Sequence, residues 1–287
     1  MVSAADIDVF EAARPRLFGI AYRMLGSRQE AQELVQEAWL RWQGTDRSAV
    51  REPAAFLATT VTRLAINEAQ SARARRETYI GPWLPEPVDT SADPALGALN
   101  GEALEVGVLM LLEKLSPAER ASYVLHEAFD YSYREIADTL QLTEANARQL
   151  AARARKKLAG GRRAKADAAT HRRLLNAIVA AAQAGDVAAL ERLLAEDVVT
   201  YADGGGLVNA ARKPIMGRER VAKALVGLAG KFWVGASFDG LDANGRPALY
   251  VHRDGEPIVV ASINPSEDGG VAQIFFQANP EKLPVTR

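Results

Sequence analysis

The side chains best suited to molecular recognition lie in the segment TEANARQLAARARKKL at 143–158. At helical spacing its apolar residues share one face, which would pack on a neighbouring helix. The polar residues that remain are predicted to point largely outward: Asn146, Arg148, Gln149, Arg153, Arg155 and Lys156. Amide groups hydrogen-bond to base edges and guanidinium or ammonium groups bind phosphates. The predicted chemistry is therefore non-covalent recognition of nucleic acid.

A second helix must position this face. The preceding segment YSYREIADTL carries Ile136, Ala137 and Leu140 at helical spacing, and a short break follows at 141–142. Thr143 can cap the second helix with its hydroxyl, and Glu144 complements the positive end of that helix. The pair predicts a helix-turn-helix.

Charge is unevenly distributed along the chain. The formal net charge is -1, yet eight Lys or Arg and no Asp or Glu lie between positions 147 and 165. A basic solvated face on an ordinary helical hairpin is the commoner meaning of a charge run alone. The tight turn together with the polar face of the second helix favours DNA.

Composition sets limits on the function. The 287 residues, 48% of them hydrophobic, have room for two or three domains. The chain has no cysteine, and its three histidines lie in separate segments without ligand spacing, so we expect no metal and no cofactor. The N-terminus has neither a signal peptide nor a long apolar run, which predicts a cytoplasmic protein without a membrane partner.

Two helical segments precede the helix-turn-helix. Residues 8–42 are predicted to be helical, with a break at 26–27 where Ser27 and Glu30 have the spacing of a capping box. The polar side of the second helix is mostly acidic, which suits either solubility or docking to a basic partner. Pro53 then starts a long helix whose polar side includes Arg63, Asn67 and Ser71. That side could contact a nucleic-acid strand, although a solvated helix fits nearly as well.

The remaining segments have other signatures. Residues 77–100 are rich in proline, which predicts an extended linker, and the apolar residues within it predict that it docks on something. From about 169 three amphipathic helices precede four alternating segments, which predicts an α+β cone. Aromatic and polar side chains could line a cavity there: Tyr201, Asp203, Phe232, Trp233, Phe238, Tyr250 and His252. We favour the alternative that the aromatics fill the cone and Asp203 forms a turn.

In its order of motifs the chain resembles the extracytoplasmic-function (ECF) sigma factors of bacterial RNA polymerase. EAQELVQEAW and REPAAFLATTVTRLAINEAQSARARR would be region 2, and the helix-turn-helix would be region 4. The resemblance implies contacts with the coiled coil of the largest polymerase subunit by Glu33, Leu34, Val35, Gln36, Glu37 and Trp39, and a further contact with the flap region. It implies that the loop at 44–52 captures a flipped base. Many relatives carry Asp at the position of Asn67.

The resemblance also implies DNA contacts. Those to the minus-ten promoter element would come from Arg63, Asn67, Ser71, Arg73, Arg75 and Arg76. Those to the minus-thirty-five element would come from Thr143, Glu144, Asn146, Arg148, Gln149, Arg153, Arg155 and Lys156.

Three short motifs resemble the sigma-factor group with a fused SnoaL-like domain: WLPEP at 83–87, DGGG at 203–206 and NPEKL at 279–283. We predict intramolecular regulatory contacts among Trp83, Leu84, Pro85, Asp203, Gly204, Asn279, Pro280, Lys282 and Leu283. The resemblance implies two all-α domains followed by an α+β SnoaL-like (NTF2-like) cone. The expected boundaries are 1–76 for region 2, 77–105 for the linker, 106–160 for region 4, 161–169 for a basic tether and 170–287 for the cone.

Two other functions remain open at this level. The chain could be a free helix-turn-helix regulator whose cone senses a small ligand, which would bind a palindrome without polymerase. It could also be an enzyme whose cone is a cyclase or isomerase, which would lose its turnover in Asp203→Ala. We favour a sigma factor that is not an enzyme, because a lone carboxylate without a partner for proton transfer is not a catalytic site.

Overall fold

The computed structural model describes residues 4–90, 104–159 and 167–283. Their contacts form two compact units. The first contains the described residues of 4–77 and 104–159, and the second contains those of 78–90 and 167–283. Of the predicted linker at 77–105, the structure describes residues 77–90 and 104–105. Of the predicted tether at 161–169, residues 161–166 lie outside the described residues. Asp167 caps a helix that begins at Ala168.

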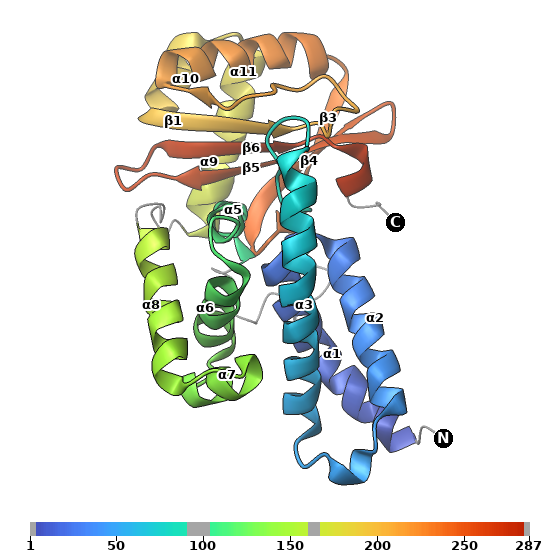
Figure 1. The fold of residues 1–287 in the computed structure, drawn as a ribbon. Helices are drawn as coiled ribbons and strands as arrows, with labels where there is room; N and C mark the ends of the chain where they lie inside the picture. The colour runs from blue at the N-terminus through green and yellow to red at the C-terminus, as the bar shows by residue number, and fades with distance from the viewer. Residues whose placement is uncertain (1–3, 91–103, 160–166, 284–287) are drawn as a thin grey trace. The chain divides into compact units, whose positions relative to one another are not determined.

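Helices of 22, 17 and 25 residues dominate the N-terminal part of the first unit. In chain order the elements, shown in blue to cyan in Figure 1, are α1 (Ala4–Leu25), α2 (Arg28–Gly44), the short 3-10 helix η1 (Arg47–Ala49) and α3 (Pro53–Glu77). Ser27 caps α2 by accepting a hydrogen bond from the backbone N–H of Glu30, and Pro53 starts α3, as predicted. Within the predicted base-capture loop, Asp46 caps η1.

The second group of helices in this unit carries the predicted helix-turn-helix. It comprises α5 (Val106–Leu112), α6 (Pro117–Phe129), α7 (Tyr133–Leu140) and α8 (Glu144–Ala159). Capping boxes start α6 at Ser116 and α7 at Ser132, and α7 ends at Gln141 in the left-handed conformation. The backbone N–H of Asn146 donates to the hydroxyl of Thr143, which confirms Thr143 as the cap of α8.

Two arginines, the buried Arg120 and the half-buried Arg16, join the two groups of helices within the first unit. Arg120 on α6 donates to the Met24 carbonyl at 2.7 Å and to Glu113 at 2.6 Å. Arg16 on α1 donates to the Phe129 carbonyl at 3.0 Å, and its guanidinium lies over the ring of Tyr131. Burial lowers the pKa of Arg120. Because buried cations are stable only when paired or hydrogen-bonded, these residues fix how α1 and α6 pack.

The second unit is an α+β cone, which confirms the predicted fold class. Its helices are α9 (Ala168–Gln183), α10 (Val187–Leu193) and α11 (Arg218–Phe232). Its strands are β1 (Leu194–Asp203), β2 (Ile215–Met216), β3 (Ala236–Ala243), β4 (Arg246–Arg253), β5 (Glu256–Pro265) and β6 (Val271–Gln277), and a short 3-10 helix η3 (Pro280–Lys282) follows. Within this unit α9 packs on β4 and β5, and α11 packs on β1 (Figure 1).

The sheet order is β2-β1-β6-β5-β4-β3. Consecutive strands from β3 to β6 pair antiparallel, but β1 pairs with β6 in parallel. Parallel neighbours need a long connection, and α11 with the four strands β2 to β5 supplies it. Periodicity alone predicted the strands and missed this pairing.

The two faces of β1 and β6 have different neighbours. Val198, Ile274 and Phe276 belong to the main hydrophobic core, which the helices cover. Tyr201 and Phe275 stack on each other, and their positions alternate with those of the core residues. Asp203 and Gln277 continue this second face at the strand ends, where they meet the Pro-rich segment at 78–90.

Candidate functional sites

The polar face of α8 is largely exposed. Arg148, Gln149, Arg153 and Lys156 are exposed, whereas Asn146 is half-buried. Arg148 forms an i,i+4 ion pair with Glu144 at 2.9 Å, and its guanidinium lies 5.2 Å from the centre of the Tyr133 ring. Exposed pairs of this kind contribute little to stability, so phosphates can displace them.

Arg155 differs from the other predicted residues of this face. Its side chain donates to Glu127 at 2.6 Å and to the Tyr133 hydroxyl at 2.8 Å. Arg155 therefore joins α8 to α6 and α7 within the helix-turn-helix instead of pointing away from it. Its predicted DNA contact would compete with these two hydrogen bonds.

Four of the predicted minus-ten residues on α3 are exposed: Arg63, Asn67, Ser71 and Arg73. Of these, Arg63 also has a partner on another helix. Arg63 donates from Nε to the Thr139 carbonyl at 2.8 Å, at the last turn of α7. Arg63 thus satisfies a free carbonyl at a helix C-terminus, where a cation is also favoured.

The arginines that end α3 have partners inside the first unit. Arg75 forms ion pairs with Glu30 on α2 and with Glu68 on α3. Arg76 forms an ion pair with Glu113 and donates to the Leu25 carbonyl. Both were predicted to contact DNA. Arg76, whose side chain is 15% exposed, helps to hold α3 in place, whereas Arg75 is 55% exposed and its ion pairs can be displaced.

The polar face of α2 is the candidate polymerase surface. Glu33 and Gln36 are exposed, and Leu34, Glu37 and Trp39 are half-buried. Val35 is only 5% exposed, so its side chain lies in the core and not on this surface. Leu40, which the sequence reasoning missed, is 54% exposed beside these residues.

In the second unit the three short motifs meet at Asp203, whose exposed fraction is 0%. Oδ1 accepts from the Tyr79 hydroxyl at 2.6 Å and from the Gly205 N–H at 3.0 Å. Oδ2 accepts from the Leu84 N–H at 2.8 Å and from Lys282 Nζ at 2.8 Å. We call this set, with Gln277 and Asn279, the Asp203 clasp. It joins the proline-rich segment, the end of β1 and the C-terminal tail.

The clasp buries one cation against one anion and two aromatic rings. Lys282 Nζ lies 4.6 Å from the ring centre of Tyr79 and 4.5 Å from that of Trp83, and it also donates to the Leu84 carbonyl at 2.9 Å. Burial, and then the hydrogen bond to Asp203, raise the pKa of Tyr79. Tyr79 therefore remains a neutral donor to the carboxylate.

The remaining motif residues support the clasp. Asn279 Nδ2 donates to the Tyr79 hydroxyl at 2.9 Å, and Gln277 Nε2 donates to the Leu84 and Pro85 carbonyls. Gly205 has a positive φ of 60°, and a Cβ there would collide with Asn279. The glycines of DGGG thus permit the close approach of the tail. Tyr79 and Gln277 were not singled out as contacts from the sequence.

The proline-rich segment runs on along the cone. The Val88 N–H donates to Asn244 Oδ1 at 3.2 Å, and the Thr90 N–H donates to the Asp242 carbonyl at 2.9 Å. Asp89 forms a β-bridge with Ala243. The expectation that this apolar linker docks on another part of the chain is met by these contacts within the second unit.

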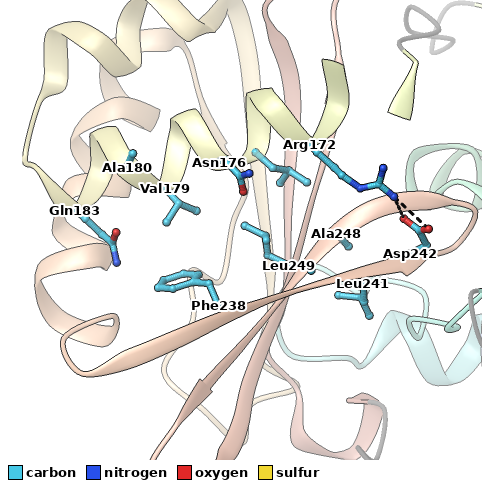
Figure 2. Close-up of a pocket in the computed structure, with 12 residues that line it drawn as sticks. Arg172, Asn176, Val179, Ala180, Gln183, Phe238, Leu241, Asp242, Ala248 and Leu249 are labelled. Atoms are coloured by element: carbon cyan, nitrogen blue, oxygen red, sulfur yellow. Dashed lines mark hydrogen bonds and ion pairs between the residues drawn. The ribbon is translucent and has the colours of Figure 1, made fainter. Parts of the chain in front are cut away.

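Two of the hollows in the described part of the cone have the size of a small-molecule site. One, of about 670 Å³, lies between α9 and the strands β3 and β4, and Figure 2 shows the Arg172–Asp242 ion pair at one end. Phe238 lines it. The other, of about 540 Å³, is lined by Phe232 at the end of α11, by Trp233 directly after it and by strand residues. Trp233 and Phe238 pack against each other in the core as expected, and both also border these hollows, so the aromatics fill only part of the cone.

The other residues predicted to line a cavity lie elsewhere. Tyr201 stacks on Phe275, Asp203 is in the clasp, and Tyr250 packs against His252. Among the described residues, no group of three His, Cys, Asp or Glu side chains is placed to hold a metal ion. None of the helices within the described ranges is long and apolar enough to span a membrane.

The helix-turn-helix has a cationic face, a second helical face could bind DNA, and the α+β domain holds a linker. These features define a DNA-recognition protein with a fused accessory domain. Comparison with known proteins identifies its family. Residues 9–75 match the model for Sigma-70 region 2, and residues 106–158 match that for Sigma-70, region 4.

Full-length relatives agree. The ECF RNA polymerase sigma factor SigJ of Mycobacterium tuberculosis is 34% identical over 97% of this chain and 93% of its own. The probable ECF sigma factor SigI of the same organism is 32% identical over 98% of this chain and 94% of its own. The crystal structure of SigJ covers 96% of this chain and 97% of its own, with a TM-score of 0.78 and 33% identity. The chain belongs to the ECF family of RNA polymerase sigma factors, and its C-terminal domain is SnoaL-like.

Proposed function

We propose that this sigma factor binds core polymerase through α2, recognises promoter DNA through α3 and α8, and is regulated by the Asp203 clasp. The observation that carries the regulatory part is the clasp itself, in which a buried carboxylate binds the linker and the tail at once. As a partner of polymerase, the protein would act in the cytoplasm.

Core polymerase would bind the exposed side of α2. Glu33 and Gln36 offer acceptors at its surface, and the half-buried Leu34 and Trp39 offer apolar area beside them. An acidic rim around apolar residues suits a basic helical partner such as the coiled coil of the largest subunit. Leu40 extends the apolar part of this surface.

Promoter DNA would bind two separate faces. The exposed Arg148, Gln149, Arg153 and Lys156 of α8 suit a major groove in the minus-thirty-five element. The exposed Asn67, Ser71 and Arg73 of α3 suit an opened minus-ten strand, where a flipped base needs hydrogen-bonding partners. Arg63 is exposed on the same helix, and its hydrogen bond to the Thr139 carbonyl would compete with a contact to that strand.

Asp203 is not placed to act as a catalytic base. Its two oxygens accept from Tyr79, Gly205, Leu84 and Lys282, and these donors compete with any substrate for the same lone pairs. We therefore propose that the SnoaL-like domain acts by holding the linker and not by turnover.

The test is transcription in vitro with purified core polymerase and the full-length chain on a promoter library. Promoter-specific transcripts are expected. Asp203→Asn should change their yield, and Glu196→Gln, at an exposed carboxylate on the same strand, should leave it unchanged. A chain that neither binds core polymerase nor starts transcripts would contradict the sigma-factor proposal. Equal output from all three proteins would contradict the regulatory part.

A further inference from the structure

The cavity of about 540 Å³ beside α11 has the size of a small-molecule site. Most of its lining is apolar, including Leu228 and Trp233 from the helix side and Phe276 from the sheet. The charged residue among the described lining residues is Arg253, which is exposed. A cavity of this composition suits an apolar molecule, and Arg253 disfavours a cationic one.

A polar side chain faces this cavity without a partner. Thr200 is 6% exposed, and its hydroxyl makes no hydrogen bond to any described residue. It lines the cavity together with Ala202, two positions further along β1. Because a buried hydroxyl without a partner is unfavourable, a molecule that hydrogen-bonds to Thr200 would recover that loss.

The same strands separate the cavity from the Asp203 clasp. Thr200 and Ala202 line the cavity, and Asp203, the next residue, belongs to the opposite face, as strand alternation requires. On β6, Phe276 lines the cavity while Gln277 donates to the linker.

The C-terminal tail at 279–283 also contacts both the cavity and the Asp203 clasp. Pro280 and Leu283 line the cavity, whereas Lys282 between them donates to Asp203. A molecule that displaces Pro280 or Leu283 must therefore move residues that flank a clasp donor.

We propose that this cavity binds an apolar small molecule, neutral or anionic, that hydrogen-bonds to Thr200, and that its binding alters the hold of the tail on the Asp203 clasp. The second clause rests on the proposed function of the clasp, and the first does not.

The binding test uses the full-length chain and the fluorescent probe N-phenyl-1-naphthylamine, a neutral apolar molecule with one N–H donor. Saturable binding is expected. Ala224→Phe, which fills the cavity from α11, should weaken it at least about tenfold. Ala180→Phe is the matched control, because Ala180 lines the other hollow from α9. Thr200→Val keeps the shape and should weaken binding about two- to tenfold, as expected for one neutral hydrogen bond.

A second probe tests the charge preference. 1-Anilinonaphthalene-8-sulfonate adds a sulfonate to the same skeleton, and Arg253→Gln should weaken its binding more than that of the neutral probe. Three results would overturn the site. They are the absence of saturable binding, equal weakening of binding by Ala224→Phe and Ala180→Phe, and unchanged binding in one of Ala224→Phe and Thr200→Val. Circular dichroism of each variant separates lost binding from lost folding.

Hydrogen exchange at the Leu84 amide, which donates to Asp203, tests the coupling. The neutral probe should change its exchange rate in the wild-type chain and not in Ala224→Phe. Bound probe with an unchanged rate at Leu84 would overturn the coupling. These measurements need no polymerase, so a failure of transcription and a failure of ligand binding are told apart.

Discussion

Replacement of the clasp carboxylate should loosen the linker and the tail together. Asp203→Asn keeps the side-chain volume but removes the charge opposite Lys282, whose side chain is only 9% exposed. It also turns an amide NH₂ toward groups that are themselves donors. Removing one partner of a buried ion pair costs about 3–5 kcal/mol. The free energy of opening at the Leu84 amide should fall by about that amount.

Native-state hydrogen exchange measures this free energy locally, which suits a chain whose two units need not unfold together. Lys282→Met removes the cation, and Asp203→Asn with Lys282→Met completes a double-mutant cycle. The double variant should lose less than the sum of the two single losses, by at least about 1 kcal/mol. Glu196→Gln is the control and should change nothing. Additive losses within about 0.5 kcal/mol would refute a direct Asp203–Lys282 interaction.

Three other outcomes follow from the described contacts. Arg63→Ala should speed hydrogen exchange in α7, since it removes the hydrogen bond to the Thr139 carbonyl, a loss of about 1 kcal/mol; unchanged exchange would contradict that role. Burial, then Arg246 and Arg172, lower the pKa of His171 to about 4, so the unfolded chain binds a proton that the folded cone excludes. Stability of the cone should therefore fall as pH drops from about 6.5 toward 4, and His171→Phe should flatten this dependence in urea unfolding. Arg148→Ala should reduce by about 1 the salt dependence of promoter binding by the holoenzyme, and an unchanged slope in anisotropy titrations would argue against a phosphate contact.

Local signals predicted much of the fold. Thr143 caps α8, and Pro53 starts α3, because caps and fixed φ angles act within one turn of a helix. The strands of the cone followed from alternation and turns. The meeting of WLPEP, DGGG and NPEKL came from a resemblance and not from spacing, since Asp203 and Lys282 are 79 positions apart and the WLPEP contacts join residues 119 and 198 positions apart.

Long-range contacts could not be read from periodicity. Helical spacing placed Arg63 and Arg155 on polar faces, but it does not say which other helix lies opposite those faces. The same holds for Arg76, whose partner Glu113 lies on another segment. The parallel pairing of β1 with β6 was missed for a similar reason, because strand alternation carries no information on which strand is the neighbour.

Arg63 on α3 was predicted to bind DNA but contacts α7 within the first unit. Arg63 has two possible polar environments, the carbonyl end of α7 and a nucleic-acid strand, and a contact that draws the guanidinium toward the strand would cost its hydrogen bonds to the Thr139 and Asp138 carbonyls. A carbonyl contact stabilises by about 1 kcal/mol, whereas a phosphate also releases counterions. The balance should therefore favour DNA at low salt and α7 at high salt. In that case the salt dependence of promoter binding reports the opening of the α3–α7 contact as well as the phosphates that are neutralised.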